Sequence, residues 1–81
     1  MTPEIQKEVE LLRGEIKRRG FMSEAQIRSE IATRNYKSDK NELLPLIECE
    51  DIKIATYTNQ YLNGLAVRKL YYYNYKEKNE I

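Results

Sequence analysis

A change of sequence period near Ile52 constrains the fold more than any other feature of the chain. Residues 52–62 and 65–75 are rich in β-branched and aromatic residues and alternate with the period of a β-strand. Asn63 and Gly64 lie between the two runs, and this dipeptide favours a type I′ turn because both central positions of that turn need positive φ. The sequence therefore predicts two long antiparallel strands joined by a tight hairpin loop.

This loop also predicts which residues pair and which face each one occupies. It would place Leu62 opposite Leu65, Thr56 opposite Tyr71 and Ile54 opposite Tyr73. Because side chains alternate across a strand, one face should pack on the rest of the protein and the other should meet solvent or a partner. The packed face is predicted to carry Ile52, Ile54, Tyr73 and Tyr75. The opposite face is predicted to carry Lys53, Tyr57, Asn59, Arg68 and Tyr72.

A first amphipathic helix is predicted over residues 3–19. Its apolar stripe, with spacings of three and four, consists of Ile5, Val9, Leu12 and Ile16. Gly20 should end this helix. The basic run at 17–19 lies in the last turn, where it complements the helix dipole or contacts phosphate.

Two shorter helices should follow. A Ser-x-x-Gln spacing that begins at Ser23 is typical of a capping box and predicts a second helix of about ten residues. A third helix is expected over about 38–48, capped by Ser38 or Asp39. Pro45 lies inside it and removes one backbone hydrogen bond, so we expect this helix to be short or kinked.

The composition favours a binding protein over an enzyme. The chain of 81 residues has no histidine, which removes the commonest general base and metal ligand, and we find no glycine-rich phosphate loop or metal-ligand spacing. Its one cysteine, Cys49, excludes an internal disulfide and suits the reduced cytoplasm. No apolar run approaches the ~18 residues of a membrane span. We expect one cytoplasmic domain over 1–81, without cofactor or metal, in which 76–81 form a frayed polar tail.

The order of three helices and a hairpin resembles the winged helix-turn-helix family along nearly the whole chain. More narrowly, the segment Leu-Leu-Pro-Leu-Ile-Glu at 43–48, followed by Ile-Lys-Ile at 52–54, is similar to the third helix and first wing strand of PadR-like regulators. The Arg-Lys-Leu-Tyr-Tyr-Tyr segment at 68–73 is similar to their basic, tyrosine-rich second wing strand. The resemblance implies an α+β fold and a DNA-binding transcriptional regulator that acts as a homodimer on double-stranded DNA.

In that family the third helix enters the major groove and the wing lies on the backbone or in the minor groove. The implied recognition helix is about 38–48 and the implied wing about 52–75. The matching DNA-binding candidates are Lys37, Ser38, Lys40 and Asn41 at the start of the helix, and Lys53, Asn59, Arg68 and Lys69 on the wing. A helix cap and a solvated strand face are the alternative interpretations of these residues.

The sequence departs from the family pattern in two places. Asp51 stands where members usually have a glycine, and the third helix region carries acidic residues where basic ones are common. These acidic residues are Glu42, Glu48 and Glu50. They weaken the DNA-binding interpretation without excluding it, because a helix that enters the groove presents its N-terminal residues to the bases while its C-terminal turn lies away from the duplex, and the N-terminal end here keeps donors suited to bases and phosphates.

Tyrosines on the exposed hairpin face support a second hypothesis. Tyr57 and Tyr72 are candidates for a protein contact, since tyrosine is enriched in interfaces. The alternative function is therefore a winged-helix module that binds a partner protein instead of DNA. A third interpretation, a single-stranded nucleic-acid binder that stacks bases on the strands, is disfavoured by a sheet of only two strands. The residue bias suits a protein of a phage, virus or other mobile element.

Overall fold

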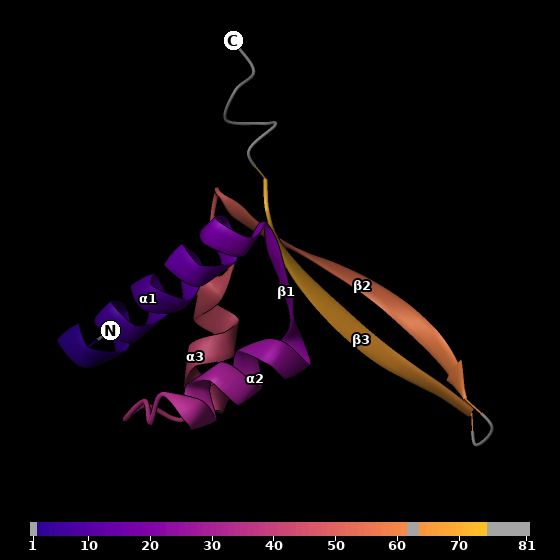
Figure 1. Ribbon diagram of the computed structural model, residues 1–81, viewed down its shortest axis with the longest axis horizontal. Coiled ribbons are helices and arrows are strands. Elements are labelled where there is room, and N and C mark those ends of the chain that lie inside the picture. The colour runs from indigo at the N-terminus through magenta and orange to yellow at the C-terminus, as the bar shows by residue number, and fades with distance from the viewer. Residues whose placement is uncertain (1, 62–63, 75–81) are drawn as a thin grey trace, which may run out of the picture.

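The computed structural model describes residues 2–61 and 64–74. These residues form three helices and three strands in an α+β arrangement (Figure 1). In chain order the elements are α1 (Pro3–Arg19), β1 (Phe21–Ser23), α2 (Glu24–Thr33), α3 (Lys40–Ile47), β2 (Ile52–Tyr61) and β3 (Gly64–Tyr73).

Helix α1 has the bounds that its sequence predicts. The side chain of Thr2 caps its N-terminus by accepting a hydrogen bond from the backbone N–H of Ile5, 3.2 Å away. At the other end Gly20 adopts a φ of 93°, which glycine adopts without steric cost, and its N–H donates to the carbonyl of Ile16. The apolar stripe is buried at Val9, Leu12 and Ile16.

Local capping also defines α2 and α3. The predicted capping box is present: the Ser23 hydroxyl accepts from the backbone of Gln26, whose side chain accepts from the backbone of Ser23. Asp39 is the N-cap of α3, so Ser38 lies outside the helix. Helix α3 has eight residues and contains Pro45, which confirms the expectation of a short helix.

The prediction of a two-stranded sheet was wrong, because β1 adds a third strand. The sheet is antiparallel in the order β1-β3-β2, and Met22 of β1 pairs with Tyr71 of β3. Three residues are too short a segment for an alternating pattern to stand out, and their partner lies about fifty positions away in the chain. The short segment Phe21–Ser23, for which the sequence predicts no strand, is therefore an edge strand.

The predicted hairpin register was also wrong, by two residues. Tyr61 pairs with Gly64, so Ile54 lies opposite Tyr71 and Ile52 opposite Tyr73. The predicted loop pair is displaced, because Gly64 is already part of β3, where its φ is 127°. A shift of two keeps every residue on its predicted face, so the hydrophobic pattern could not distinguish the two registers. Leu62 and Asn63 lie outside the described residues, as do Tyr75 and the predicted tail at 76–81.

The helices cover one face of the sheet. All three helices and the covered sheet face contribute to one core, which consists of Val9, Leu12, Ile16, Met22, Ile27, Ile31, Leu43, Leu44, Ile47, Ile52 and Tyr71. Beyond this base, β2 and β3 leave the helices and extend as a two-stranded ribbon (Figure 1). The predicted packing of Ile52 is confirmed, whereas Ile54 and Tyr73 are half-buried.

Candidate nucleic-acid interface

The arginines at the end of α1 are engaged by acidic residues. The carboxylate of Glu15 forms ion pairs with Arg18 and Arg19, each over 2.9 Å, and Arg34 lies 3.8 Å away. Glu30 of α2 binds Arg34 at 2.6 Å and Arg19 at 3.4 Å. The hydrogen bonds from Arg18 and Arg19 outweigh burial and lower the pKa of Glu15 from its ordinary 4.5 to about 2.

This network decides between the two interpretations of the basic run at 17–19. Lys17 pairs with Asp51 at 3.1 Å, while its ammonium lies 5.9 Å from the centre of the Tyr73 ring. All three cations of the run therefore have acidic partners within the protein. Arg19 links α1 to α2, Lys17 links α1 to the start of the hairpin, and Arg18 pairs within α1, which favours the structural interpretation over a phosphate site.

The loop between α2 and α3 is anchored to α1. The backbone N–H groups of Lys37 and Ser38 donate to the Glu8 carboxylate over 2.7 and 3.1 Å. Burial raises the pKa of Glu8, but the hydrogen bonds from the Ser38 side chain and from both backbones outweigh it, so its pKa is lowered overall. The Lys37 ammonium also lies 3.7 Å from Glu4. The structure thus gives Lys37 and Ser38 contacts that order the loop.

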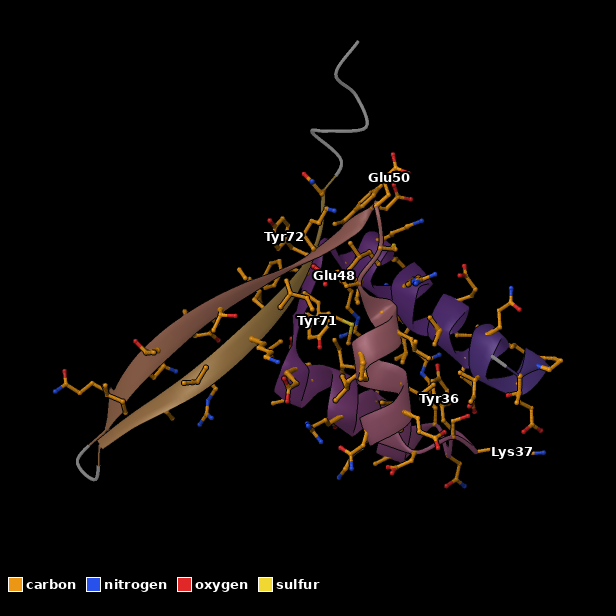
Figure 2. All side chains as sticks on the ribbon, turned by 180° about the vertical axis from the view of Figure 1, so that it is seen from behind. Tyr36, Lys37, Glu48, Glu50, Tyr71 and Tyr72 are labelled. Carbon is orange, nitrogen blue, oxygen red and sulfur yellow. The ribbon has the colours of Figure 1, made fainter. Side chains whose placement is uncertain are left out.

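The first turn of α3 is open to solvent. Asp39 caps it by accepting from the backbone N–H of Asn41, 3.3 Å away, and the side chains of Lys40 and Asn41 are exposed. Lys40 borders a shallow hollow that reaches along α2 to Arg28. The loop that leads into this turn lies at the end of the helices away from the hairpin, as the position of Lys37 shows (Figure 2).

A second hollow lies between the start of α2 and the hairpin. Its volume is about 440 Å³. It is lined by Ser23, Glu24, Ala25, Arg28, Tyr57, Val67, Arg68 and Lys69. The sequence predicted Tyr57, Arg68 and Lys69 as binding residues, and the fold brings these three together.

Arg28 is the member of this site that the sequence analysis missed. It pairs with Glu24 of its own helix at 3.0 Å, and it lines both hollows. Nothing in the local sequence distinguishes it from an ordinary i,i+4 ion-pair residue, because its neighbours on the hairpin are forty positions away. Arg28 thus lies between the hollow beside the start of α3 and the hollow beside the basic residues of β3.

The other two wing candidates lie elsewhere on the sheet. Lys53 is half-buried and directly opposite Tyr72, and Asn59 is half-buried opposite Ala66. Neither lines a hollow with Arg68 and Lys69. The eight predicted DNA-binding residues are thus divided among the loop, the first turn of α3, the hollow beside α2, and the uncovered sheet face.

The remaining exposed surface of α3 is acidic. Glu42 and Pro45 are exposed along the helix, and Glu48 is exposed at its C-terminal cap. Glu48 and Glu50 lie toward the base of the hairpin (Figure 2). The sequence at 52–74 contains no acidic residue. Charge is therefore separated within the protein, with acid along α3 and basic residues on the strands.

Other kinds of site find no support in the described part of the chain. Residues 2–61 and 64–74 contain no group of three or more acidic or cysteine side chains that could hold a metal ion. None of their helices is long and apolar enough to cross a membrane. Cys49 is half-buried and packs against the core. Comparison with models of protein families, with characterised proteins and with solved structures gives no match.

Proposed function

We propose that this protein is a winged-helix transcriptional regulator that binds double-stranded DNA. Three helices followed directly by an antiparallel hairpin support the winged-helix assignment. A ribbon that extends beyond the helices is suited to follow a phosphate backbone or enter a minor groove.

The observation that carries the proposal is the convergence of Arg28, Arg68 and Lys69 around one hollow, which Glu24, the ion-pair partner of Arg28, also lines. Lys40 lines the second hollow, which Arg28 also borders. Arginine and lysine side chains gathered at one hollow can contact phosphates, and phosphate contacts fix the register of a protein on the duplex. Lys40 can then donate to guanine acceptors and Asn41 can pair with adenine.

The acidic part of α3 limits how the protein can approach the duplex. Glu42, in the first turn of α3, and Glu48, at its C-terminal cap, repel phosphates, so the helix approaches the groove with Lys40 and Asn41 foremost and its C-terminal end points away from the duplex. A surface with so few cations binds weakly as a monomer, because each phosphate contact releases few counterions and so adds little to the binding free energy. Two copies on two half-sites supply the remaining affinity, so the proposal includes a homodimer.

A second candidate function is supported by the same acidic surface. The exposed carboxylates of Glu42, Glu48 and Glu50, together with exposed Tyr57 and Tyr72, suit a protein partner with a basic surface. Such a module would use the same fold without DNA.

Substitution of basic residues that line the hollow distinguishes DNA binding from protein binding. Arg68→Ala and Lys69→Ala should each weaken binding to a labelled DNA duplex by roughly fivefold or more, measured by fluorescence anisotropy. Lys7→Ala removes an exposed lysine from α1 and is the control, with unchanged affinity expected. Equal affinity of all three variants and the unsubstituted protein would contradict the proposed site, and no binding to duplex at low salt would favour the protein-interaction function.

A further inference from the structure

The face of the sheet away from the helices carries aromatic and basic side chains. We call it the outer sheet face. Its described residues are Phe21 and Ser23 of β1, Lys53, Ala55, Tyr57 and Asn59 of β2, and Ala66, Arg68, Leu70 and Tyr72 of β3. The contrast with the covered face is sharp in β1, where Phe21 is 59% exposed and the next residue, Met22, is 0% exposed.

The strand pairing places these side chains in rows. Phe21 lies opposite Tyr72, and Tyr72 lies opposite Lys53, so one row crosses all three strands. Two rows further along, Tyr57 lies opposite Arg68. Directly opposite residues have Cβ atoms ~5 Å apart, so each cation lies beside an exposed aromatic ring.

The charge of this face indicates what kind of partner covers it. The face has two cations, Lys53 and Arg68, and no acidic residue. If a second copy packed on it face to face, about a two-fold axis, the like-charged Lys53 and Arg68 of both copies would lie in one interface. An anionic partner with flat apolar groups matches both the charges and the rings.

We propose that the outer sheet face binds single-stranded nucleic acid. Bases stack on Phe21, Tyr72 and Tyr57, and the phosphates between them lie beside Lys53 and Arg68. The third strand is essential to this proposal, because a two-stranded ribbon would lack the row that Phe21 completes.

This site shares Tyr57 and Arg68 with the hollow of the proposed function, whereas Phe21, Tyr72 and Lys53 belong to the outer sheet face alone. In a duplex the flat faces of the bases are already stacked on one another, so rings on a sheet cannot reach them. The rows of Tyr72 and Tyr57 are ~14 Å apart along the strands, at ~3.4 Å per residue. A mononucleotide cannot span both rows, and affinity should therefore rise with oligonucleotide length.

The test is anisotropy of a fluorescein-labelled oligothymidine of about a dozen nucleotides, a length within the usual site size of stacking surfaces. The unsubstituted protein should bind it more tightly than thymidine monophosphate used as a competitor. Phe21→Ala and Tyr72→Ala should each weaken binding by roughly 5- to 100-fold. Tyr72→Phe keeps the ring and should keep the affinity. Leu65→Ala, an exposed residue of the other hairpin face, is the control and should change nothing.

Three outcomes would overturn the inference: no binding of the oligothymidine at low salt, equal affinity of the alanine variants whose circular dichroism matches that of the unsubstituted protein, or loss of affinity in Tyr72→Phe equal to that in Tyr72→Ala. Duplex binding is measured on the same variants. Phe21→Ala and Tyr72→Ala should leave it unchanged, so failure at the duplex surface and failure at the outer sheet face are told apart. A dimer that dissociates in Phe21→Ala, without oligothymidine binding, would assign the face to a second copy.

Discussion

At the scale of single residues, Arg13 connects α1 to the C-terminal end of α3. Its guanidinium donates to the last two carbonyls of α3, from Nε to Ile47 over 3.0 Å and from Nη2 to Leu46 over 2.6 Å, and it pairs with Glu10 at 2.8 Å. The last carbonyls of a helix have no partner within the helix, and a cation there also complements the helix dipole. Arg13 thus serves as a C-terminal cap supplied by another helix.

Arg13→Ala should therefore destabilise the protein. Hydrogen bonds to a charged group contribute about 1.5–3 kcal/mol, so we expect a loss of that size in the free energy of unfolding, measured with urea. Arg18→Ala is the matched control, because Arg18 also pairs with a glutamate three positions earlier but is largely exposed. It should cost clearly less than Arg13→Ala, because exposed ion pairs contribute little to stability. Equal losses in the two variants would contradict the capping role.

At the scale of elements, the ion-pair network around Glu15 ties α1 to α2 and makes their contact sensitive to acid. The pKa of Glu15 is lowered from 4.5 to about 2 in the folded protein. A carboxylate with a lowered pKa stabilises the folded state above its unfolded pKa, and that stabilisation is lost as the pH falls through the folded pKa. The stabilising effect of Glu15 is therefore complete above about pH 4.5 and disappears towards about pH 2.

Glu15→Gln tests this pH dependence. The variant should be less stable than the unsubstituted protein at neutral pH, and the difference should shrink as the pH falls from about 4.5 to about 2, measured by urea unfolding across that range. Glu50→Gln, at an exposed position, is the control, and it should change the stability at neutral pH less than Glu15→Gln does. A Glu15→Gln variant with an unchanged acid profile would contradict the network.

The elements also differ in how far the sequence predicts them. Helices α1 and α2 follow from an apolar stripe and from local caps, which are encoded within a few residues of each other. The register of the hairpin and the strand β1 do not, because they depend on tertiary contacts. Pairing Met22 and Ile54 with Tyr71 buries that tyrosine to 3% exposure beneath the helices. Alternation has a period of two and cannot detect a shift of two.

At the scale of the whole molecule, the candidate site also combines residues that the local sequence identifies with residues that only tertiary contacts bring together. Sequence pattern identified Tyr57, Arg68 and Lys69 as exposed or basic wing residues, and their convergence follows from the strand pairing. Arg28 and Phe21 could not be found in this way. Each gains its neighbours from a segment far away in the chain, and neither stands in a motif. Charge separation between α3 and the strands is visible in the sequence, but its placement on two surfaces is not.

Binding of duplex DNA by a local basic surface should depend steeply on salt concentration. For a protein that neutralises Z phosphates, log K falls with log salt with a slope of about −0.9Z. With Arg28, Lys40, Arg68 and Lys69 engaged, we expect a slope of about −3 to −4 per protein chain in an anisotropy titration of a duplex at several salt concentrations. Duplex affinity that is independent of salt, or a slope unaffected by Arg68→Ala, would contradict the account.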